Sequence, residues 1–375
     1  MALCLLHAGP ALAFSWNADK AQQAEQLLKQ FQLSHKVPLV SASVALNGQV
    51  AFEINFNPGG SIAPQGEPIR YRIGSVSKQI TAGAMLALIE DRTVLRSNNR
   101  PIDLETPLSD VFVNVDRASA AGQVTVRRLL NMTSNIPSYT NDELAFSPNS
   151  TGTVYAAQPI NENQIIQRLR TYRLTGDPPA FDYSNTNYFL LAPIIDVVKG
   201  GDRLGSVPAS QEFIRQRILS KAGMSSSRFV NEPAPAGAPE AQPNFLRAPL
   251  LNQGAWPKGA GDLISTVGDL SRWNIALMSG QVLGKGSLQS MLEPAAPVKE
   301  SAVYSGCSYA MGWYACDRHT YRLYQHDGVI SGFMASNAIA RRPDNSWVSV
   351  TVLANSDATI DIVELVRGIV RVADQ

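Results

Sequence analysis

Three patterns of hydrophobic and polar residues follow one another in the N-terminal quarter of the chain. Residues 16–32 carry apolar side chains at helical spacing, which predicts an amphipathic helix. Its apolar face would consist of Ala21, Ala24, Leu27, Leu28 and Phe31. Two apolar runs, residues 39–45 and 50–56, are separated by Asn-Gly at positions 47–48, and this predicts a β-hairpin. Residues 80–89 are apolar on nearly every side, so the helix that contains them is expected to be buried.

The middle of the chain, from about residue 95 to residue 300, has mainly helical periodicity and long connections. Helices are expected at residues 126–131, 160–174, 185–198, 213–222 and 267–278. Residues 233–243 are rich in Pro, Ala and Gly and are expected to form a surface loop.

Strand patterns return in the C-terminal part and predict a meander with a turn at residues 343–346, followed by a helix at about 359–372. The expected strands are residues 309–315, 321–325, 334–341 and 347–355. Strands at both chain ends with helices between them imply an α+β fold, in which one antiparallel sheet is flanked by the terminal helices.

The same pattern divides the chain into two parts. Residues 14–94 and 301–375 would form an α/β subdomain, and residues 95–300 a mainly helical subdomain. The helix that starts at Ser75 would pass from one part to the other, so a cleft is expected between them.

The composition is that of a soluble globular enzyme. The 375 residues include 45% hydrophobic and 17% charged residues. A net charge of +1 does not indicate a nucleic acid or an anionic membrane surface as partner. Residues 1–13 end in Ala-Leu-Ala and resemble the remnant of a signal peptide cleaved before Phe14, and no later segment would span a membrane. We therefore expect a periplasmic or secreted protein.

Cys307 and Cys316 could form a disulfide in an oxidising compartment. If residues 309–314 form one extended strand, however, the two cysteines lie roughly 30 Å apart, well beyond the ~7 Å that a disulfide allows. This favours unpaired cysteines, whereas a turn at Gly312 would bring them together.

Ser75 and Lys78 begin the buried helix and are spaced i, i+3, so they share one helix face. A lysine in this position must be paired, or its pKa must fall. A neutral lysine could take the proton of Ser75 and make it a nucleophile. Alternatively, Ser75 only caps the helix and Lys78 extends to solvent, and this short motif alone does not distinguish the two.

Tyr183 and Asn185 stand where another apolar helix begins. Tyr183 could transfer a proton if a nearby lysine and the helix N-terminus lowered its pKa, and Asn185 could hold a substrate carbonyl or orient Lys78. The alternative is helix capping with a packed aromatic side chain. A similar tyrosine-to-asparagine triplet at residues 139–141 lies in a loop and is ranked lower.

A third motif, His326-Asp327-Gly328-Val329, follows a predicted short strand. Gly328 could let a substrate backbone come close, and the N–H of Val329 could form an oxyanion hole with that of Ser75. The alternative is a plain turn with solvated side chains. Lys221-Ala-Gly223 looks like a helix end with a glycine cap, not a further copy of this motif.

Together the motifs resemble those of the penicillin-recognising serine hydrolases, the family of class C β-lactamases, D-alanyl-D-alanine carboxypeptidases and related esterases and peptidases. The similarity extends to residues 129–138, 261–270 and 309–313 and covers almost all of the predicted mature chain. It implies a β-lactamase/transpeptidase-like fold and an acyl-enzyme mechanism. Ser75 would be the nucleophile, Lys78 the general base and Tyr183 the proton donor to the leaving group, with Asn185 and the third motif binding substrate.

The resemblance implies a β-lactam, a peptidoglycan peptide or an ester as substrate, and we expect no metal or cofactor. Two further interpretations stay open: a carboxylesterase for short acyl esters, and a penicillin-binding sensor that is acylated without turnover. One residue departs from the family pattern. Asp327 stands where related enzymes have a threonine that helps bind a substrate carboxylate. Since like charges repel, we expect substrates with a carboxylate beside the scissile bond to bind poorly.

Overall fold

The structure is a computed structural model. The structure describes residues 13–56, 68–140, 162–169, 180–200, 208–234, 239–244, 258–299, 301–330, 332–357 and 361–375.

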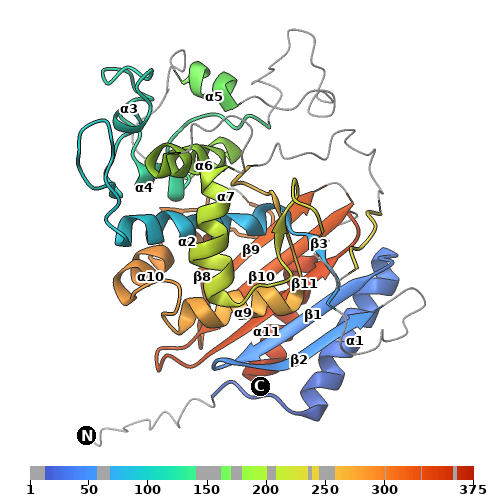
Figure 1. Cartoon of the computed structure of the whole chain (residues 1–375). Coiled ribbons are helices and arrows are strands. Elements are labelled where there is room, and N and C mark those ends of the chain that lie inside the picture. The colour runs from blue at the N-terminus through green and yellow to red at the C-terminus, as the bar shows by residue number, and fades with distance from the viewer. Residues whose placement is uncertain are drawn as a thin grey trace, which may run out of the picture.

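An eight-stranded antiparallel sheet is built from both ends of the chain (Figure 1), in the order β2-β1-β11-β10-β9-β8-β7-β6. Its strands are β1 Val40–Leu46, β2 Gln49–Phe56, β6 Ala296–Pro297, β7 Ser308–Ala310, β8 Trp313–Asp317, β9 Arg322–Ile330, β10 Phe333–Arg341 and β11 Trp347–Ala354. The N-terminal hairpin joins the C-terminal meander through the pairing of β1 with β11, in which Val44 lies opposite Val350. The predicted hairpin turn is confirmed: Asn47 and Gly48 have φ angles of 47° and 94°, as a tight hairpin requires.

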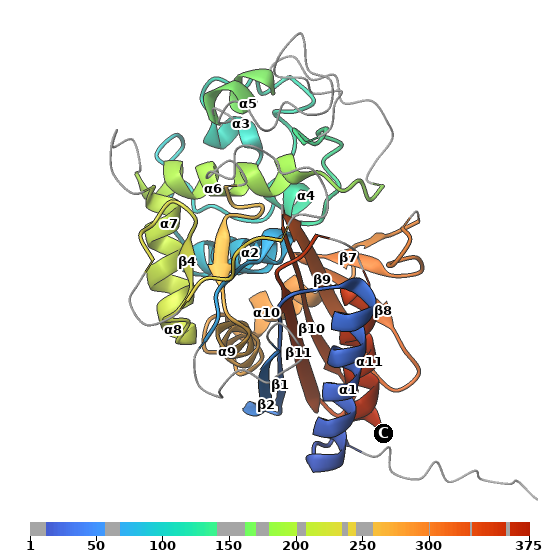
Figure 2. The ribbon, with the colours of Figure 1, turned by 90° about the vertical axis from the view of Figure 1, so that its right-hand side faces the viewer.

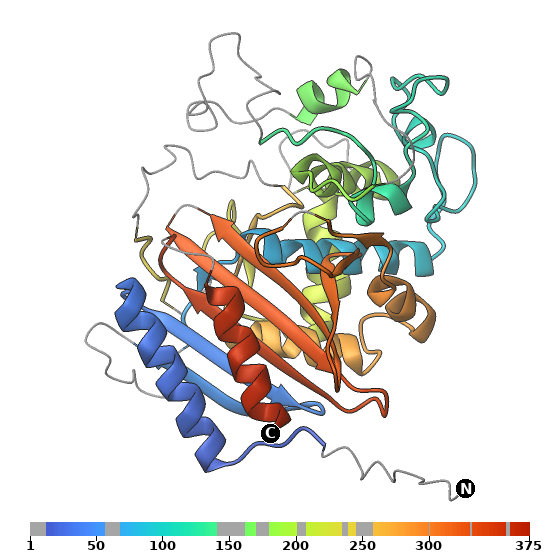
Figure 3. The same cartoon turned by 180° about the vertical axis from the view of Figure 1, so that it is seen from behind.

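Helices cover both faces of this sheet (Figure 2). On one face α1 (Ala18–His35) and α11 (Ile362–Asp374) lie side by side (Figure 3). On the other face α9 (Val267–Met278) packs against β1, β2 and β11. The helix α2 (Ser77–Glu90) lies between the sheet and the helical part and contacts α6 (Asn185–Lys199).

A buried amide network joins the sheet to α2 and α9. The Asn337 side chain donates to Gln79 Oε1 at 2.8 Å and exchanges hydrogen bonds with the Asn274 amide. The hydroxyl of Thr351 donates to Asn337 Oδ1 at 2.7 Å. These hydrogen bonds fix the position of α2 on the sheet, although one buried donor of the network, Gln79 Nε2, has no hydrogen-bond partner among the described residues.

The middle of the chain is mainly helical, as predicted. Besides α2, α6 and α9, its elements are α3 Leu108–Val111, α4 Val126–Leu130, α5 Glu162–Arg168, α7 Ala209–Ile214, the π-helical turn η4 Arg215–Leu219, α8 Ser220–Ala222 and α10 Lys285–Leu292. A small sheet that was not predicted consists of β3 Tyr71–Arg72, β5 Leu263–Ser265 and β4 Arg228–Phe229, in that order.

The expectation of unpaired cysteines is wrong. The chain turns at Gly312 (φ 85°), a conformation that favours glycine, so β7 and β8 form a hairpin in place of one strand. The turn brings Cys307 and Cys316 to a Cα–Cα distance of 4.4 Å, and they form a disulfide.

The C-terminal strand β9 extends to Ile330 and includes the third motif, whereas the sequence suggested that the strand ends at residue 325. The predicted α+β architecture, with one antiparallel sheet from both chain ends and a mainly helical part, is confirmed. The subdomain boundaries stay a prediction. None of the helices in the described ranges is long and apolar enough to cross a membrane.

Candidate active site

Ser75 lies in a 3₁₀ turn, η1 (Gly74–Val76), that leads directly into α2. The turn packs against β9 so closely that a Cβ on Gly328 would lie 2.1 Å from the carbonyl oxygen of Ile73. Only glycine fits there, because any side chain would collide with the backbone. The sequence suggested that this glycine makes room for a substrate backbone. In the structure, the protein's own backbone fills the space at its α-carbon.

Lys78 is fully buried and contacts the hydroxyl of Ser75. Its Nζ lies 2.9 Å from Ser75 Oγ, 2.8 Å from Asn185 Oδ1 and 2.8 Å from the carbonyl oxygen of Ala260. Burial lowers the pKa of Lys78 to about 7, although the carboxylates of Asp327 and Asp262 act in the opposite direction. The alternative in which Lys78 extends to solvent is therefore wrong.

Tyr183 approaches the same hydroxyl from α6's N-terminal side. Its hydroxyl donates to Ser75 Oγ at 3.0 Å, and the Lys78 Nζ lies 5.1 Å from the centre of its ring. Burial raises the pKa of Tyr183 above its ordinary value, so the lowered pKa considered from sequence does not occur. At neutral pH Tyr183 is thus a protonated phenol, suited to donating a proton.

Asn185 is held in place by a segment that sequence reasoning did not assign to the site. Its backbone N–H donates to Ser138 Oγ at 3.1 Å, and its side-chain Nδ2 donates to Thr140 Oγ1 at 3.1 Å. Between them, Tyr139 is buried and packs on Phe189, with ring centres 5.3 Å apart. From the sequence, Tyr139 was a weaker catalytic candidate than Tyr183, and its buried position against Phe189 is consistent with that order. The sequence signal for Ser138 was the family-like segment at residues 129–138, which ends in this serine, whereas Thr140 lies beyond that segment.

His326 points into a cluster of aromatic rings and does not contact Ser75 through any described hydrogen bond. Its Nδ1 donates to the carbonyl oxygen of Asp327 at 2.6 Å, and its Nε2 lies 3.2 Å from the hydroxyl of Tyr309. Burial and the nearby Lys78 lower its pKa to about 3, so the ring is neutral at pH 7. The rings around it belong to Tyr183, Tyr309 and Tyr314.

Asp327 is partly exposed, and Oδ1 of its carboxyl group accepts a hydrogen bond from the hydroxyl of Tyr304 at 2.9 Å. Burial raises the pKa of Asp327, and the Tyr304 hydrogen bond partly offsets the effect. Tyr304 in turn stacks on Tyr314, with ring centres 3.7 Å apart. The sequence placed Asp327 in the site but gave no sign of this tyrosine.

Val329 is exposed, and its peptide group lies beside the Ser75 turn. A Cβ on Gly74 would lie 3.2 Å from the Val329 nitrogen, and one on Gly328 would lie 2.9 Å from the Ser75 nitrogen. The two N–H groups named from the sequence are therefore neighbours. Their action as an oxyanion hole stays a prediction.

A buried aspartate, Asp262, was missed by sequence reasoning. It is 2% exposed, and its Oδ1 accepts from the N–H of Gly259 at 3.1 Å, which shapes the loop that presents the Ala260 carbonyl to Lys78. Burial raises the pKa of Asp262 to about 7. At the start of the loop, Lys258 forms ion pairs of 2.6 Å with two carboxylates, those of Glu162 and Asp196.

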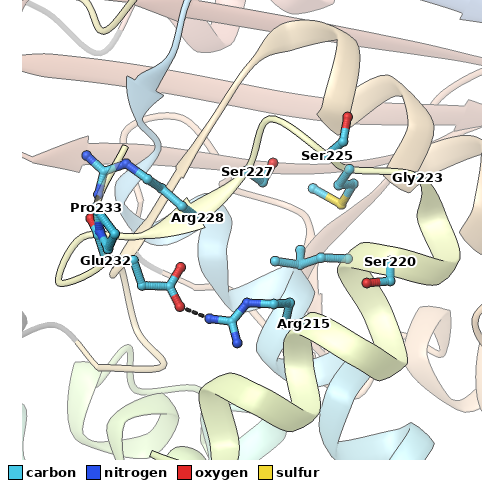
Figure 4. A pocket seen from close by; sticks show the side chains of 10 residues that line it. Arg215, Ser220, Gly223, Ser225, Ser227, Arg228, Glu232 and Pro233 are labelled. Carbon is cyan, nitrogen blue, oxygen red and sulfur yellow. Dashed lines mark hydrogen bonds and ion pairs between the residues drawn. The ribbon is translucent and has the colours of Figure 1, made fainter. Parts of the chain in front are cut away.

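A separate cavity of about 560 Å³ lies beside η4, α8 and β4 (Figure 4). Its charged side chains are already paired, Arg215 with Glu232 and Arg228 with Glu240. None of the predicted site residues lines it. Among the described residues, no group of three or more His, Cys, Asp or Glu side chains could hold a metal ion. The candidate active site is therefore the Ser75 constellation.

The sequence of this chain matches a known protein family along nearly its whole length. A family model described as Beta-lactamase matches residues 24–373. The chain belongs to the β-lactamase family. A member from Bacillus subtilis (strain 168), PbpX, is named as a penicillin-binding protein and is 23% identical over 335 residues, which cover 86% of this chain and 74% of that protein. The unguisins hydrolase ungD of Aspergillus violaceofuscus is 25% identical over 331 residues, covering 76% of this chain and 52% of that protein.

Solved structures with the same fold include an enzyme and a penicillin-binding protein homologue. The D-amino acid amidase of Ochrobactrum anthropi SV3, complexed with L-phenylalanine, has a TM-score of 0.73 and 21% identity, covering 95% of this chain and 98% of that chain. The octameric penicillin-binding protein homologue of Pyrococcus abyssi has a TM-score of 0.70 and 23% identity, covering 90% and 74%. At these identities the likeness shows the fold, the β-lactamase/transpeptidase-like arrangement expected from the motifs.

Proposed function

We propose that this β-lactamase-family protein is a serine hydrolase that cleaves an amide or ester bond through an acyl-enzyme. The observation that carries the proposal is the position of the Ser75 hydroxyl, which lies 2.9 Å from the Lys78 amine and 3.0 Å from the Tyr183 hydroxyl. A hydroxyl between a desolvated amine and a protonated phenol has both a base and an acid within hydrogen-bond reach.

In the proposed reaction, neutral Lys78 accepts the Ser75 proton while Oγ attacks the substrate carbonyl. The N–H groups of Ser75 and Val329 would stabilise the oxyanion. When the tetrahedral intermediate collapses, Tyr183 donates its proton to the leaving group, and the proton held by Lys78 restores the phenol. Hydrolysis of the acyl-enzyme repeats these steps with water as nucleophile. A pKa of about 7 leaves a large fraction of Lys78 neutral under physiological conditions.

With this acyl-enzyme mechanism, the reaction would be hydrolysis of the β-lactamase or D-alanyl-D-alanine-peptidase type. Hydrolysis of short acyl esters is the second candidate. Asp327 favours the ester, because the family resemblance assigns its position to the binding of a substrate carboxylate, and like charges repel. A penicillin-binding sensor that is acylated without turnover would use the same serine.

We also propose that the chain is exported to the periplasm or secreted. The disulfide between Cys307 and Cys316 supports this, since such bonds persist in oxidising compartments. Fractionation of cells that produce the full chain would test it, and recovery of the protein only in the cytosol would contradict it.

Two assays test the proposed function. Nitrocefin and p-nitrophenyl butyrate are compared as substrates, and the intact mass of the protein is recorded after brief exposure to penicillin. Turnover of either chromogen by wild type but not by Ser75→Ala supports a hydrolase, whereas a long-lived penicillin adduct without turnover supports the sensor. If folded wild-type protein neither turns over nor forms an adduct at Ser75, the proposal is wrong.

A further inference from the structure

The third motif carries a carboxyl group where the family pattern has a neutral hydroxyl. A carbonyl oxygen can only accept, so the 2.6 Å contact with the Asp327 carbonyl places the proton of His326 on Nδ1. Its Nε2 is then free to accept from the hydroxyl of Tyr309 at 3.2 Å. The histidine is 1% exposed and neutral, so it cannot offset the carboxylate of Asp327.

The surroundings of Asp327 leave its carboxylate without a bound cation. Tyr304 supplies one neutral hydroxyl at 2.9 Å. Arg367 of α11 lies over the ring of Tyr304 at 5.4 Å, but its guanidinium donates to Gln325 and Glu364. Among the ion pairs within the described ranges, none joins Arg367 to Asp327.

The remaining groups that face Asp327 are the phenols of Tyr183 and Tyr314 and the amine of Lys78. The phenols are neutral because burial raises the pKa of both. Lys78 is neutral when it acts as the base. In the reactive state these three groups therefore carry no positive charge. The remaining cation that acts on Asp327 is Arg367, and its guanidinium is held by hydrogen bonds to other groups.

The Asp327 carboxylate is close enough to Lys78 and Tyr183 to act electrostatically on both groups. The next residue, Gly328, packs against the Ser75 turn so tightly that its Cβ would lie 2.9 Å from the Ser75 nitrogen. Neighbouring α-carbons are about 3.8 Å apart, so the Asp327 side chain starts one residue away from the nucleophile's backbone. The side chain is partly exposed, which leaves it accessible to a ligand.

We infer that Asp327 is the binding group for an ammonium group on the substrate, within one or two carbons of the scissile bond, and that amines of this class are the preferred substrates. The inference rests on the proposed function and gives its substrate class. An amine would occupy the place where related enzymes hold a carboxylate, next to the Asp327 oxygen that already accepts the Tyr304 hydroxyl. A charge-assisted hydrogen bond at a partly buried site corresponds to a preference of about tenfold to a hundredfold.

Matched amides test the inference on both sides of the scissile bond. On the acyl side, phenylalaninamide of either hand is compared with 3-phenylpropanamide, which lacks the amine. On the leaving-group side, N-(2-aminoethyl)phenylacetamide is compared with N-propylphenylacetamide. The ratio of kcat/KM within each pair is measured for wild type, Asp327→Asn and Asp327→Thr, with thermal unfolding to confirm that the variants fold. Asp344→Asn, in the exposed turn between β10 and β11, removes the same charge far from the site.

In wild type and Asp344→Asn we expect the amine to be favoured by about tenfold or more in at least one pair, and this ratio to fall toward one in both Asp327 variants. Ratios that are near one in wild type, or that are unchanged in the Asp327 variants, would overturn the inference. If p-nitrophenyl butyrate is still hydrolysed in that case, the proposed function stands without it. If no compound acylates Ser75, the proposed function fails, and this inference fails with it.

Discussion

The two sides of the Ser75 hydroxyl are built differently. On the helical side, Lys78 and Tyr183 each contact the hydroxyl, and Asn185 contacts Lys78. On the strand side, the side chains of His326 and Asp327 bond to tyrosines and to their own backbone. The peptide groups of the strand pack against the Ser75 turn.

The two sides of the Ser75 hydroxyl therefore have different functions, proton transfer on the helical side and substrate recognition on the strand side. The helical side fixes the proton-transfer groups by direct hydrogen bonds, so its residues cannot change without loss of the chemistry. The strand side sets the charge next to the substrate, and its side chains can change while the backbone stays in place. Substitutions made on one side at a time would show whether the two sides are as independent as this geometry implies.

The largest effect is expected on the helical side, from Lys78→Met. The variant keeps an apolar side chain of similar length but removes the base, so acylation by p-nitrophenyl butyrate should fall about a thousandfold. Stopped-flow kinetics or the time course of the adduct mass would measure it. A loss below tenfold would mean that another group takes the Ser75 proton.

Tyr183→Phe should slow the reaction by about a hundredfold, because the leaving group loses its acid. The loss should be greater for an amide than for a nitrophenyl ester, whose leaving group needs little protonation. Equal losses for both substrates would indicate that Tyr183 only positions the serine.

On the strand side, Asp327→Thr should increase acylation by a penicillin about tenfold, because a carboxylate no longer faces the substrate carboxylate. Intact-mass time courses of wild type and variant provide the comparison, with Asp344→Asn as the charge control. No gain in the variant would contradict the assigned role of Asp327.

Asp262→Asn should change the pH dependence of acylation more than the maximal rate of acylation. Lys78 is a base only when neutral, so acylation should rise with pH through about 7. The Asp262 carboxylate raises the pKa of Lys78, and its removal should move this rising limb to lower pH. Besides Asp262, the titratable groups that face Lys78 are Asp327, His326 and the phenols of Tyr183 and Tyr188, which the variant retains. A limb that stays in place or moves to higher pH would show that Asp262 does not act on Lys78.

The smallest effect on activity is expected from replacing Cys307 and Cys316 together by alanine. Loss of this short cross-link should lower the free energy of unfolding by about 2–3 kcal/mol, measured by chemical denaturation. Activity on p-nitrophenyl butyrate should change less than about threefold, because the hairpin contributes to neither the base nor the acid. A large loss of activity would show that the two sides of the site are coupled through Tyr309.

Much of the fold was predictable because local signals agree with the tertiary structure. Asn47-Gly48 can adopt the two positive φ angles of a tight turn, and the apolar face of residues 16–32 matches a helix packed on a sheet. The Gly312 turn was not predictable in the same way. Its flanking residues alternate well enough for one strand, and only the pairing of β7 with β8 distinguishes a hairpin.

The same division applies to the site. Ser75, Lys78 and Tyr183 were predictable, because their chemistry fixes residue type and spacing. The protonation state of His326 could not be predicted, because it depends on Tyr309, a residue of a different strand. The supports of Asn185 and Lys78, such as Ser138 and Asp262, depend on burial and loop shape, which no local pattern of polar residues encodes.

The contact between Gly328 and the Ile73 carbonyl has a consequence for engineering and for natural variation. Mutational tolerance should change abruptly between two adjacent positions. Position 327 should accept many side chains, which change the substrate specificity, whereas position 328 should accept only glycine. A saturation library across this strand would therefore yield a broad set of active variants at the first position and almost none at the second.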